Sequence, residues 1–379
     1  MDAQLLNDPD WWADERPLAP AGFPGGLPDL PDLAGHVLFE SSGSSGPPKW
    51  LALTKDALLL SAAAVNAHLR VDGGSCWGLA LPWHHVGGFG VLARAFEAGC
   101  RCARFEGRWQ PAVFREWLLE CGVTHTSLVP AQVHDLTAAG LAAPPDLGAV
   151  VVGGGRLGAD TGRAARALGW PVLASYGMTE AGSQIATQGL ELLDKSYQPD
   201  PIEILPLWRT RITGDDRLEI AGPALFSGTL AQGPAGWRWM ARPGEWHPTA
   251  DRARVADGRL TPLGRLDAVV KVLGELVDPE WIEIELLERA GGALGIGRFA
   301  VVAVPDARAE HRLVPVFEEI VPPEVMAAAL ADYQQRAPGF RRLHEPLRVP
   351  ALPRSPLGKI RRSELAEWLA GILETPDSR

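Results

Sequence analysis

Between residues 37 and 176, short runs of β-forming residues alternate with stretches in which apolar residues recur at helical spacing. The runs that predict strands are Trp77–Leu81, Arg101–Phe105, His125–Val129, Ala149–Val152 and Val172–Ser175. The stretches that predict helices between them are 90–98, 111–120, 131–139 and 159–168. Because parallel neighbours need a long crossover, usually a helix, this alternation predicts an α/β layered domain built on a largely parallel sheet.

The flanking regions have other patterns. Residues 1–35 are rich in Pro, Asp and Gly, which predicts a loosely structured lead-in. Its Trp11 and Trp12 could pack against the body of the domain. Residues 201–263 contain short strand-like runs between turn signals, which predicts a small β subdomain.

The last third reads as a separate α+β domain. Helices are predicted near 279–290, 323–336 and 363–373, and strands near 298–304 and 312–317. The acidic run from Glu280 to Glu288 predicts a solvated helix face. We therefore expect two domains, 1–264 and 265–379, as the length of 379 residues also suggests.

Composition excludes some classes of protein. The chain has 46 acidic and 36 basic residues and a net charge of −10, which disfavours nucleic acid and anionic membranes as partners. No apolar run is long enough to span a bilayer, and the start has no signal-peptide pattern. The four cysteines fit no zinc spacing and indicate reduced thiols, hence a cytoplasmic protein. The oligomeric state stays open, a homo-oligomer included.

A small-residue loop follows the first strand-like run, Val37–Phe39. It reads Ser41-Ser42-Gly43-Ser44-Ser45-Gly46-Pro47-Pro48-Lys49, and a helical pattern opened by Thr54 comes after it. Small residues let backbone N–H groups turn toward an anion, and the hydroxyls add donors, so the loop suits a phosphate tail. A flexible linker is the alternative reading, which Pro47-Pro48 disfavours because two prolines stiffen the loop.

Three further loops follow predicted strands, at Leu81–His85, Gly153–Gly155 and Tyr176–Glu180. Ligands of parallel α/β sheets bind at the carboxyl ends of the strands. We therefore expect these three loops to surround one site.

Five motifs in this order resemble those of the adenylate-forming acyl-CoA synthetase superfamily. They are the loop Ser41–Lys49, Tyr176-Gly177-Met178-Thr179-Glu180, Thr249-Ala250-Asp251, Gly264-Arg265-Leu266-Asp267 and Pro353-Arg354-Ser355-Pro356-Leu357-Gly358-Lys359. In the third motif Ala250 replaces the usual glycine. Each motif alone is weakly specific, whereas all five in order cover the chain from residue 37 to its end.

The resemblance implies an enzyme that first joins a carboxylic acid to the α-phosphate of ATP and releases pyrophosphate. The thiol of coenzyme A then displaces AMP. Bringing anions together requires cationic and N–H stabilisation of the phosphates. The implied cofactors are therefore ATP and Mg²⁺, with coenzyme A and a small carboxylic acid as partners.

The resemblance also implies roles for single residues. The β- and γ-phosphates would be held by the loop residues Ser41, Ser42, Gly43, Ser44, Ser45, Gly46 and Lys49. The adenosine would be held by Gly153, Gly154, Gly155, Tyr176, Gly177, Met178, Asp251 and Arg265. Glu180 would hold Mg²⁺, a hard cation that takes oxygen ligands. The catalytic residues would be Thr179 at the α-phosphate, His85 in the acid pocket and Lys359 from a mobile C-terminal domain that turns about Asp267.

Within the superfamily, three stretches resemble the o-succinylbenzoate–CoA ligases of menaquinone biosynthesis. They are Leu81–Gly88, Thr124–Gln132 and Trp246–Arg252. One departure is that full-length members carry a substantial N-terminal subdomain before the phosphate loop, whereas 40 residues precede Ser41 here. Two alternatives remain open, a ligase for another aryl or acyl acid and a non-catalytic nucleotide-binding relative.

Overall fold

The computed structural model of the chain describes residue 6 and residues 8–41, 49–233, 236–266, 268–290, 293–354 and 360–373, without the side chains of Ser41 and Leu373. The chain divides into two compact units. The first comprises residues 1–249 and 254–261, and the second comprises residues 250–253 and 262–379.

A six-stranded sheet forms the centre of the first unit. Its strand order is β4-β3-β5-β6-β7-β8, with β3 at Cys76–Leu79, β4 at Arg101–Arg104, β5 at His125–Leu128, β6 at Ala149–Val152, β7 at Val172–Met178 and β8 at Ser183–Thr187. Neighbours are parallel except for the antiparallel pair β7–β8. The predicted α/β fold with a largely parallel sheet is confirmed.

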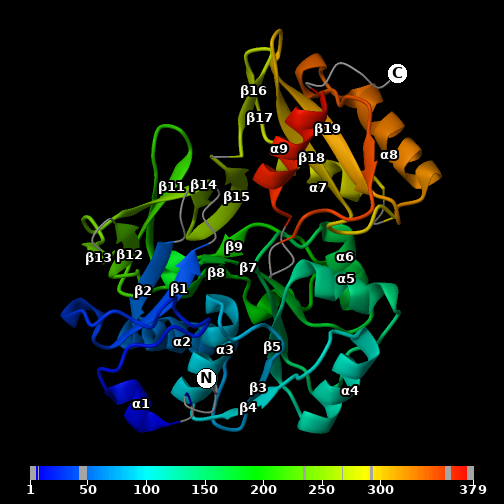
Figure 1. Cartoon of the computed structure of the whole chain (residues 1–379). Helices are drawn as coiled ribbons and strands as arrows, with labels where there is room; N and C mark the ends of the chain where they lie inside the picture. The colour runs from blue at the N-terminus through cyan, green and yellow to red at the C-terminus, as the bar shows by residue number, and fades with distance from the viewer. Residues whose placement is uncertain are drawn as a thin grey trace. The chain divides into compact units, whose positions relative to one another are not determined.

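The helices cover both faces of this sheet (Figure 1). They are α2 at Lys55–Leu69, α3 at Val86–Glu97, α4 at Pro111–Cys121, α5 at Pro130–Ala138 and α6 at Ala159–Ala167. The chain moves from β3 to β4 through α3, and in the opposite direction along the sheet through α4, α5 and α6. Right-handed crossovers therefore place α3 opposite those three helices. The order reverses between β3 and β5, which makes their carboxyl ends the switch point where such sheets bind ligands.

The strands that flank the predicted phosphate loop belong to a second, four-stranded sheet. Its order is β1-β2-β12-β13, with β1 at His36–Ser41, β2 at Lys49–Thr54, β12 at Gly228–Gly233 and β13 at Gly236–Ala241. The prediction of one small β subdomain over 201–263 is thus wrong in part, since β12 pairs with β2. This pairing joins residues far apart in sequence, which no local pattern can reveal.

The remaining strands of that region form a five-stranded sheet of order β10-β11-β14-β15-β9. Their bounds are Ile202–Glu203 for β9, Arg209–Ile212 for β10, Arg217–Ala221 for β11, His247–Ala256 for β14 and Arg259–Arg265 for β15. The division between the two units passes through β14 and β15.

The second unit is built on three strands, β18 at Phe299–Asp306, β19 at Glu310–Glu318 and β20 at Leu347–Val349, with a two-stranded ribbon of β16 at Val270–Val272 and β17 at Glu275–Val277. Its helices are α7 at Pro279–Arg289, α8 at Pro323–Arg336 and α9 at Arg362–Leu373. Alternate residues of β18 point to opposite faces. Val301 packs with residues of α7 and α8, while Val302 packs with residues of α9.

The acidic run on α7 is not the fully solvated face that its sequence predicts. Glu283 has only 12% of its side chain exposed, and it forms an ion pair with Arg362 of α9. It also accepts a hydrogen bond from the backbone N–H of Val301 at 2.7 Å. Burial raises the pKa of Glu283, and the guanidinium of Arg362 opposes that shift. This charge therefore ties α9 to α7, because a buried carboxylate requires a cationic partner.

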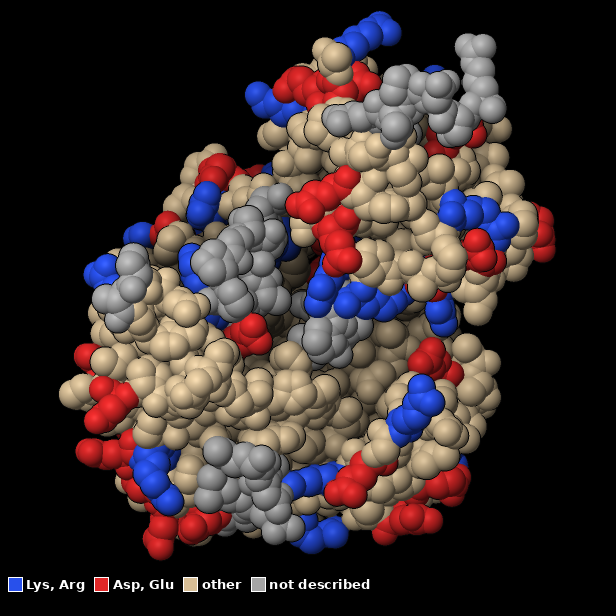
Figure 2. Space-filling view, viewed as in Figure 1, with Lys and Arg blue, Asp and Glu red and all other residues tan. Residues whose placement is uncertain are grey.

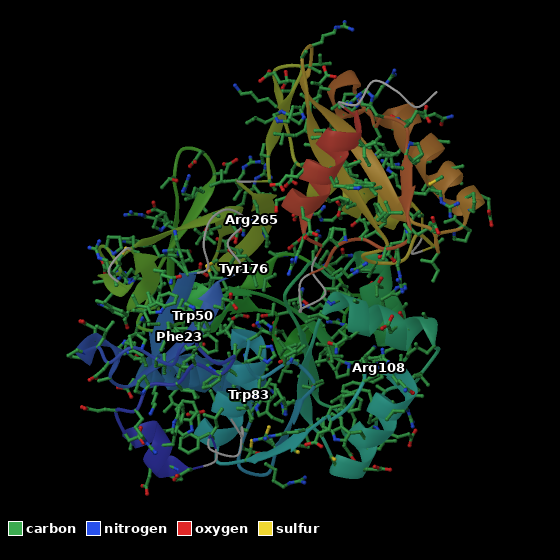
Figure 3. The ribbon with its side chains drawn as sticks, in the orientation of Figure 1. Phe23, Trp50, Trp83, Arg108, Tyr176 and Arg265 are labelled. Carbon is green, nitrogen blue, oxygen red and sulfur yellow. The ribbon has the colours of Figure 1, made fainter. Side chains whose placement is uncertain are left out.

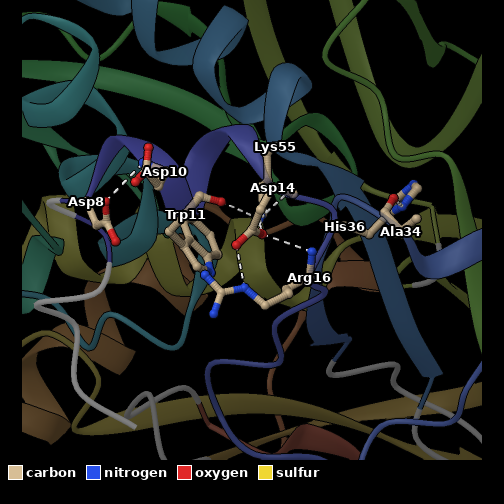
Figure 4. A network of polar contacts seen from close by, with 8 residues as sticks. All are labelled: Asp8, Asp10, Trp11, Asp14, Arg16, Ala34, His36 and Lys55. Atoms are coloured by element: carbon tan, nitrogen blue, oxygen red, sulfur yellow. Dashed lines mark hydrogen bonds and ion pairs between the residues drawn. The ribbon is translucent and has the colours of Figure 1, made fainter.

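The lead-in is docked on the body, which confirms the expected docking of Trp11 and Trp12 and shows that the prediction of a loose segment is wrong in part. Trp11 and Trp12 of α1 (Pro9–Ala13) are 2% and 6% exposed. Trp12 stacks on Phe96 of α3 with ring centroids 5.1 Å apart. The ammonium group of Lys55, whose side chain is 3% exposed, donates to the carbonyl oxygens of Trp11 and Asp14 and pairs with the Asp14 carboxylate at 2.8 Å (Figure 4). Two tryptophans and one partly buried ion pair thus hold the segment in place.

The ion pair makes part of the stability depend on pH. The hydrogen bond from Lys55 is the main reason why the pKa of Asp14 is lowered to about 2. A depressed carboxyl pKa stabilises the folded state above the unfolded-state value of about 3.9, and this stability is lost as pH falls toward about 2. Because 26% of the Asp14 side chain is exposed and solvent screens the pair, Asp14→Asn should lower the free energy of unfolding by about 1–2 kcal/mol at pH 7 and by clearly less near pH 2.

Urea unfolding at the two pH values measures this difference. Asp10→Asn, on the same short helix, is the matched control and should have little effect at either pH. A destabilisation by Asp14→Asn that is equal at both values would show that the ion pair does not account for it.

Candidate active site at the switch point of the sheet

The loop after β3 carries the predicted histidine to the switch point. His85 is the residue that precedes α3, and its carbonyl oxygen accepts from the N–H of Phe89 at 2.8 Å. Its ring lies 4.3 Å from that of His84, centroid to centroid. Gly88 is required here, because a Cβ at this position would lie 2.3 Å from the carbonyl oxygen of Pro82. The loop is therefore pressed against the first turn of α3, and His85 is fixed at the carboxyl end of β3.

A buried arginine, Arg94 of α3, lies at the same switch point. It is 2% exposed. Its guanidinium donates to the hydroxyl of Ser127 on β5 and to the hydroxyl of Ser183 on β8, each at 3.2 Å. Burial lowers the pKa of Arg94 to about 10, so the group is still cationic at neutral pH. Within the described ranges, no carboxylate lies at ion-pair distance from it. A buried cation whose hydrogen-bond acceptors among the described residues are two hydroxyls is a site suited to an anion from outside the chain.

Arg94 is also held in place by two connected side chains, those of Trp77 and Asn66. Its guanidinium lies over the ring of Trp77 at 5.1 Å. The indole N–H of Trp77 donates to the side-chain oxygen of Asn66 at 3.3 Å, and the Asn66 amide donates to the carbonyl oxygen of Arg94 at 2.8 Å. The cation–π contact favours the charged form of the arginine at this position.

The motif Tyr176–Glu180 forms the end of β7 and the 3₁₀ turn Thr179–Ala181. The register shifts at Tyr176 and Gly177, where β8 comes unusually close. A Cβ on Gly177 would lie 1.7 Å from the carbonyl oxygen of Ser183, so only glycine fits. Ser183 itself has a φ of +120°, which is costly for a non-glycine residue. Backbone strain of this kind is typical of functional sites. Here the strained residue is Ser183, whose hydroxyl accepts a hydrogen bond from Arg94.

The Gly153–Gly155 loop begins where β6 ends. The N–H of Gly153 donates to the carbonyl oxygen of Leu128 at 3.1 Å, and Gly154 has a φ of +74°. A Cβ on Gly155 would lie 3.5 Å from the ring of Pro130, at the start of α5. Since β6 pairs with β7, this loop and Tyr176 lie at the carboxyl ends of adjacent strands. Figure 3 labels Tyr176 among the side chains of the first unit.

Two other predicted site residues belong to the second unit. The carboxylate of Asp251 lies 3.7 Å from the guanidinium of Arg265, and 19% and 47% of these side chains are exposed. The neighbouring Gly264 has a φ of +104°, and a Cβ there would lie 2.1 Å from a carboxylate oxygen of Asp278. The two charged residues are thus brought together, next to a position that only glycine can occupy.

Several predicted residues lie outside the described ranges. They are Ser42, Gly43, Ser44, Ser45, Gly46, Asp267 and Lys359. Only the backbone of Ser41 is described, and Lys49 is an exposed residue at the start of β2. The roles of all these residues stay predictions.

The described residues fit a magnesium ion that is bound mainly by its substrate. No cluster of three or more His, Cys, Asp or Glu side chains that could hold a metal occurs in the described part of the chain. Mg²⁺ is commonly bound by one or two carboxylates, water and substrate phosphates. A single glutamate at a strand end, Glu180, meets that requirement.

Sequence reasoning missed Arg94, Ser127 and Ser183. The residue pattern of α3 gave one signal, because a charged residue at position 94 stands among apolar and small residues from Phe89 to Phe96. Burial of a cation is rare and points to function, but only the fold shows that it is buried.

On the face of the molecule that Figure 2 shows, the described residues form no large patch of a single charge. Figure 2 shows acidic and basic side chains interspersed over that face. Among the helices of the described ranges, none combines the length and apolar character needed to cross a bilayer.

Comparison with known proteins identifies relatives. The AMP-binding enzyme family matches residues 34–220. A probable 2-succinylbenzoate–CoA ligase of Mycobacterium tuberculosis is 32% identical over 351 residues, which cover 88% of this chain and 85% of the relative. The 2-succinylbenzoate–CoA ligase of Escherichia coli is 30% identical over 337 residues, covering 87% and 68%.

Solved structures agree with these relatives. The R195K form of E. coli MenE with bound OSB-AMS superposes with a TM-score of 0.70 at 26% identity, covering 89% of this chain and 69% of that one. The o-succinylbenzoate coenzyme A synthetase of Bacillus subtilis in complex with ATP and magnesium ion has a TM-score of 0.73 at 22% identity, covering 87% and 69%, and shows the shared fold. The chain therefore belongs to the AMP-binding enzyme family and, within it, is a relative of the 2-succinylbenzoate–CoA ligases.

Proposed function

We propose that the chain is an AMP-forming acid–CoA ligase whose acid is o-succinylbenzoate, an intermediate of menaquinone biosynthesis. The observation that carries the choice of acid is Arg94, a buried cation whose guanidinium donates to two serine hydroxyls within the described residues. An aromatic acid with a second carboxylate would supply the missing negative charge. Relatives at 30–32% identity carry the same ligase name, which supports the assignment.

In the proposed reaction the reacting carboxylate attacks the α-phosphorus of ATP. The bond between the α-phosphorus and the oxygen that bridges to the β-phosphate breaks, and pyrophosphate leaves. Bound Mg²⁺ would neutralise phosphate charge, with Glu180 as its protein ligand. Thr179 would donate to the α-phosphate, Tyr176 would stack on the adenine, and the Gly153–Gly155 backbone would approach its edge. Asp251 would accept hydrogen bonds from the ribose hydroxyls.

In the second step the thiol of coenzyme A attacks the acyl carbon, and AMP leaves. We propose that residues 1–264 hold ATP and the acid and that residues 265–379 form a C-terminal domain turning about Asp267. Lys359 would serve the first step and be withdrawn for the second. Gly264, whose φ of +104° excludes other residues, lies in the hinge motif and is suited to a change of backbone direction.

Pyrophosphate release from the purified chain tests the proposal. We expect it only when ATP, Mg²⁺ and o-succinylbenzoate are all present, with thioester appearing on addition of coenzyme A. Turnover of another acid without turnover of o-succinylbenzoate would show that the proposed acid is wrong and that the other acid is the substrate. Binding of ATP without turnover of any acid in a broad panel would favour a non-catalytic relative.

Glu180→Gln tests the proposed metal ligand. The change keeps the size of the side chain and removes its charge, so adenylation should fall by about 10²-fold or more, as for loss of a group that stabilises transition-state charge. The Mg²⁺ concentration giving half-maximal rate should also rise. An unchanged rate over a full Mg²⁺ titration would exclude Glu180 as the ligand, and Glu191→Gln provides a control elsewhere in the same unit.

A further inference from the structure

The four-stranded sheet has one face that is covered only in part. Residues of the lead-in such as Ala19 and Leu33 pack on Leu38, Ala52 and Leu230 and form a small apolar core. Where this cover stops, a cavity of about 460 Å³ remains. Its lining residues are Ala21, Gly22, Phe23, Pro24, Glu40, Trp50, Gln232 and Trp237, which together we name the tryptophan pocket.

Three aromatic residues line the tryptophan pocket, and of these Phe23 and Trp237 are partly exposed whereas Trp50 is 3% exposed. The ring centroid of Phe23 lies 4.7 Å from that of Trp50 and 4.6 Å from that of Trp237, and both pairs are tilted. Phe23 and Trp50 are labelled in the stick view of Figure 3. The faces of aromatic rings carry negative electrostatic potential, so several rings around one space attract a cation.

Glu40 is the one charged side chain among the residues that line this cavity. It lies directly opposite Trp50 in the β1–β2 register. In the described parts of the chain, no Lys, Arg or His lies within ion-pair distance of its carboxylate. The pocket therefore combines aromatic faces with an uncompensated negative charge.

These properties select one class of ligand. An anion would be repelled by Glu40, and a neutral apolar molecule would cover the carboxylate without replacing its water. A primary ammonium has three N–H donors to satisfy. The lining side chains offer only the Glu40 carboxylate and the Gln232 amide as acceptors. A fully alkylated ammonium needs no acceptors and is attracted by aromatic faces.

We propose that the tryptophan pocket binds a small quaternary ammonium ion, with its charged head against the partly exposed rings of Phe23 and Trp237 and beside Glu40. The proposal uses no residue of the switch-point site. It is therefore independent of the proposed ligase reaction.

A pair of isosteres provides the test. Choline carries a quaternary ammonium, and 3,3-dimethyl-1-butanol has the same shape without the charge. Isothermal titration of the full chain with each should show saturable binding of choline and much weaker binding of the alcohol. Methylammonium should also bind more weakly than choline, because the lining side chains offer two acceptor groups for its three N–H donors and it covers less of the aromatic surface.

Variants connect the binding to the pocket. Trp237→Leu should weaken choline binding by about 5- to 30-fold, the range that corresponds to a partly desolvated cation–π contact. Glu40→Gln should weaken it by about 2- to 5-fold, because Glu40 is exposed and solvent screens its attraction for the cation. Trp237→Phe keeps an aromatic face and should restore most of the affinity. Trp239→Leu is the matched control on the same strand outside the pocket, and Glu106→Gln is the matched control for charge.

Three results would overturn the proposal. They are no saturable binding of choline by the folded protein, equal binding of choline and its neutral isostere, and choline binding that Glu40→Gln leaves unchanged. Equal weakening by Trp237→Leu and Trp239→Leu would place the ligand elsewhere and overturn it too. Thermal unfolding of each variant shows whether the fold is kept, and Glu40→Gln still tests the proposal if Trp237→Leu fails to fold.

Discussion

Arg94→Met should lower kcat/KM for o-succinylbenzoate by about 10²- to 10³-fold, because a carboxylate desolvated in the pocket would lose its charged partner. The same change should hardly affect adenylation of a matched aromatic acid that has only one carboxylate. Steady-state kinetics with the two acids measures both effects. The folded protein should not be less stable, since methionine removes a buried charge that has no carboxylate partner among the described residues.

Arg94→Lys is the matched variant, because it keeps the charge but cannot donate to Ser127 and Ser183 in the same forked geometry. Its kcat/KM for o-succinylbenzoate should lie between the values of the wild type and of Arg94→Met. An equal loss with both acids would show that Arg94 supports the structure of the site and does not recognise the second carboxylate.

Lys359→Ala should lower the rate of adenylation by about 10²- to 10³-fold, the typical cost of losing one preorganised donor to transition-state charge. The reaction of preformed acyl-adenylate with coenzyme A should continue at nearly the normal rate, because under the proposed mechanism the lysine would act in the first step only. Pyrophosphate release and thioester formation, measured as separate half-reactions, distinguish the two steps.

The control for this lysine is Lys271→Ala in β16, another lysine of the second unit, which is exposed. A loss of similar size in both half-reactions of Lys359→Ala would point to damaged folding or to another role for the residue.

The α/β domain could be predicted because its signals are local. Each strand and helix between residues 76 and 178 has its own periodicity, and turn residues separate them. The start of α3 is the exception. The sequence pattern predicts a start at residue 90, because Gly87, Gly88 and Gly90 lower helix propensity, but the helix begins at Val86. Close packing explains Gly88, whose Cβ position is occupied by the loop before it.

The parts that could not be predicted depend on contacts between distant residues. The composition of the lead-in is typical of a loop, yet Lys55 binds it from α2. Pairing of β12 with β2 and burial of Arg94 are likewise properties of the assembled fold. The motif residues of the active site are recognised through resemblance, whereas Arg94 and its two serines lie outside the five motifs.

The ion pair between Lys55 and Asp14 also constrains the order in which the chain folds. An ammonium group loses its hydration at great cost unless its partner is already present. We therefore expect the inner surface of α2 to close together with the docking of α1, although 41 residues separate the two charges in sequence. Both helices should open together in native-state hydrogen exchange, with one shared free energy of opening. During synthesis, α1 would then have to wait for α2 to emerge before it acquires a stable structure.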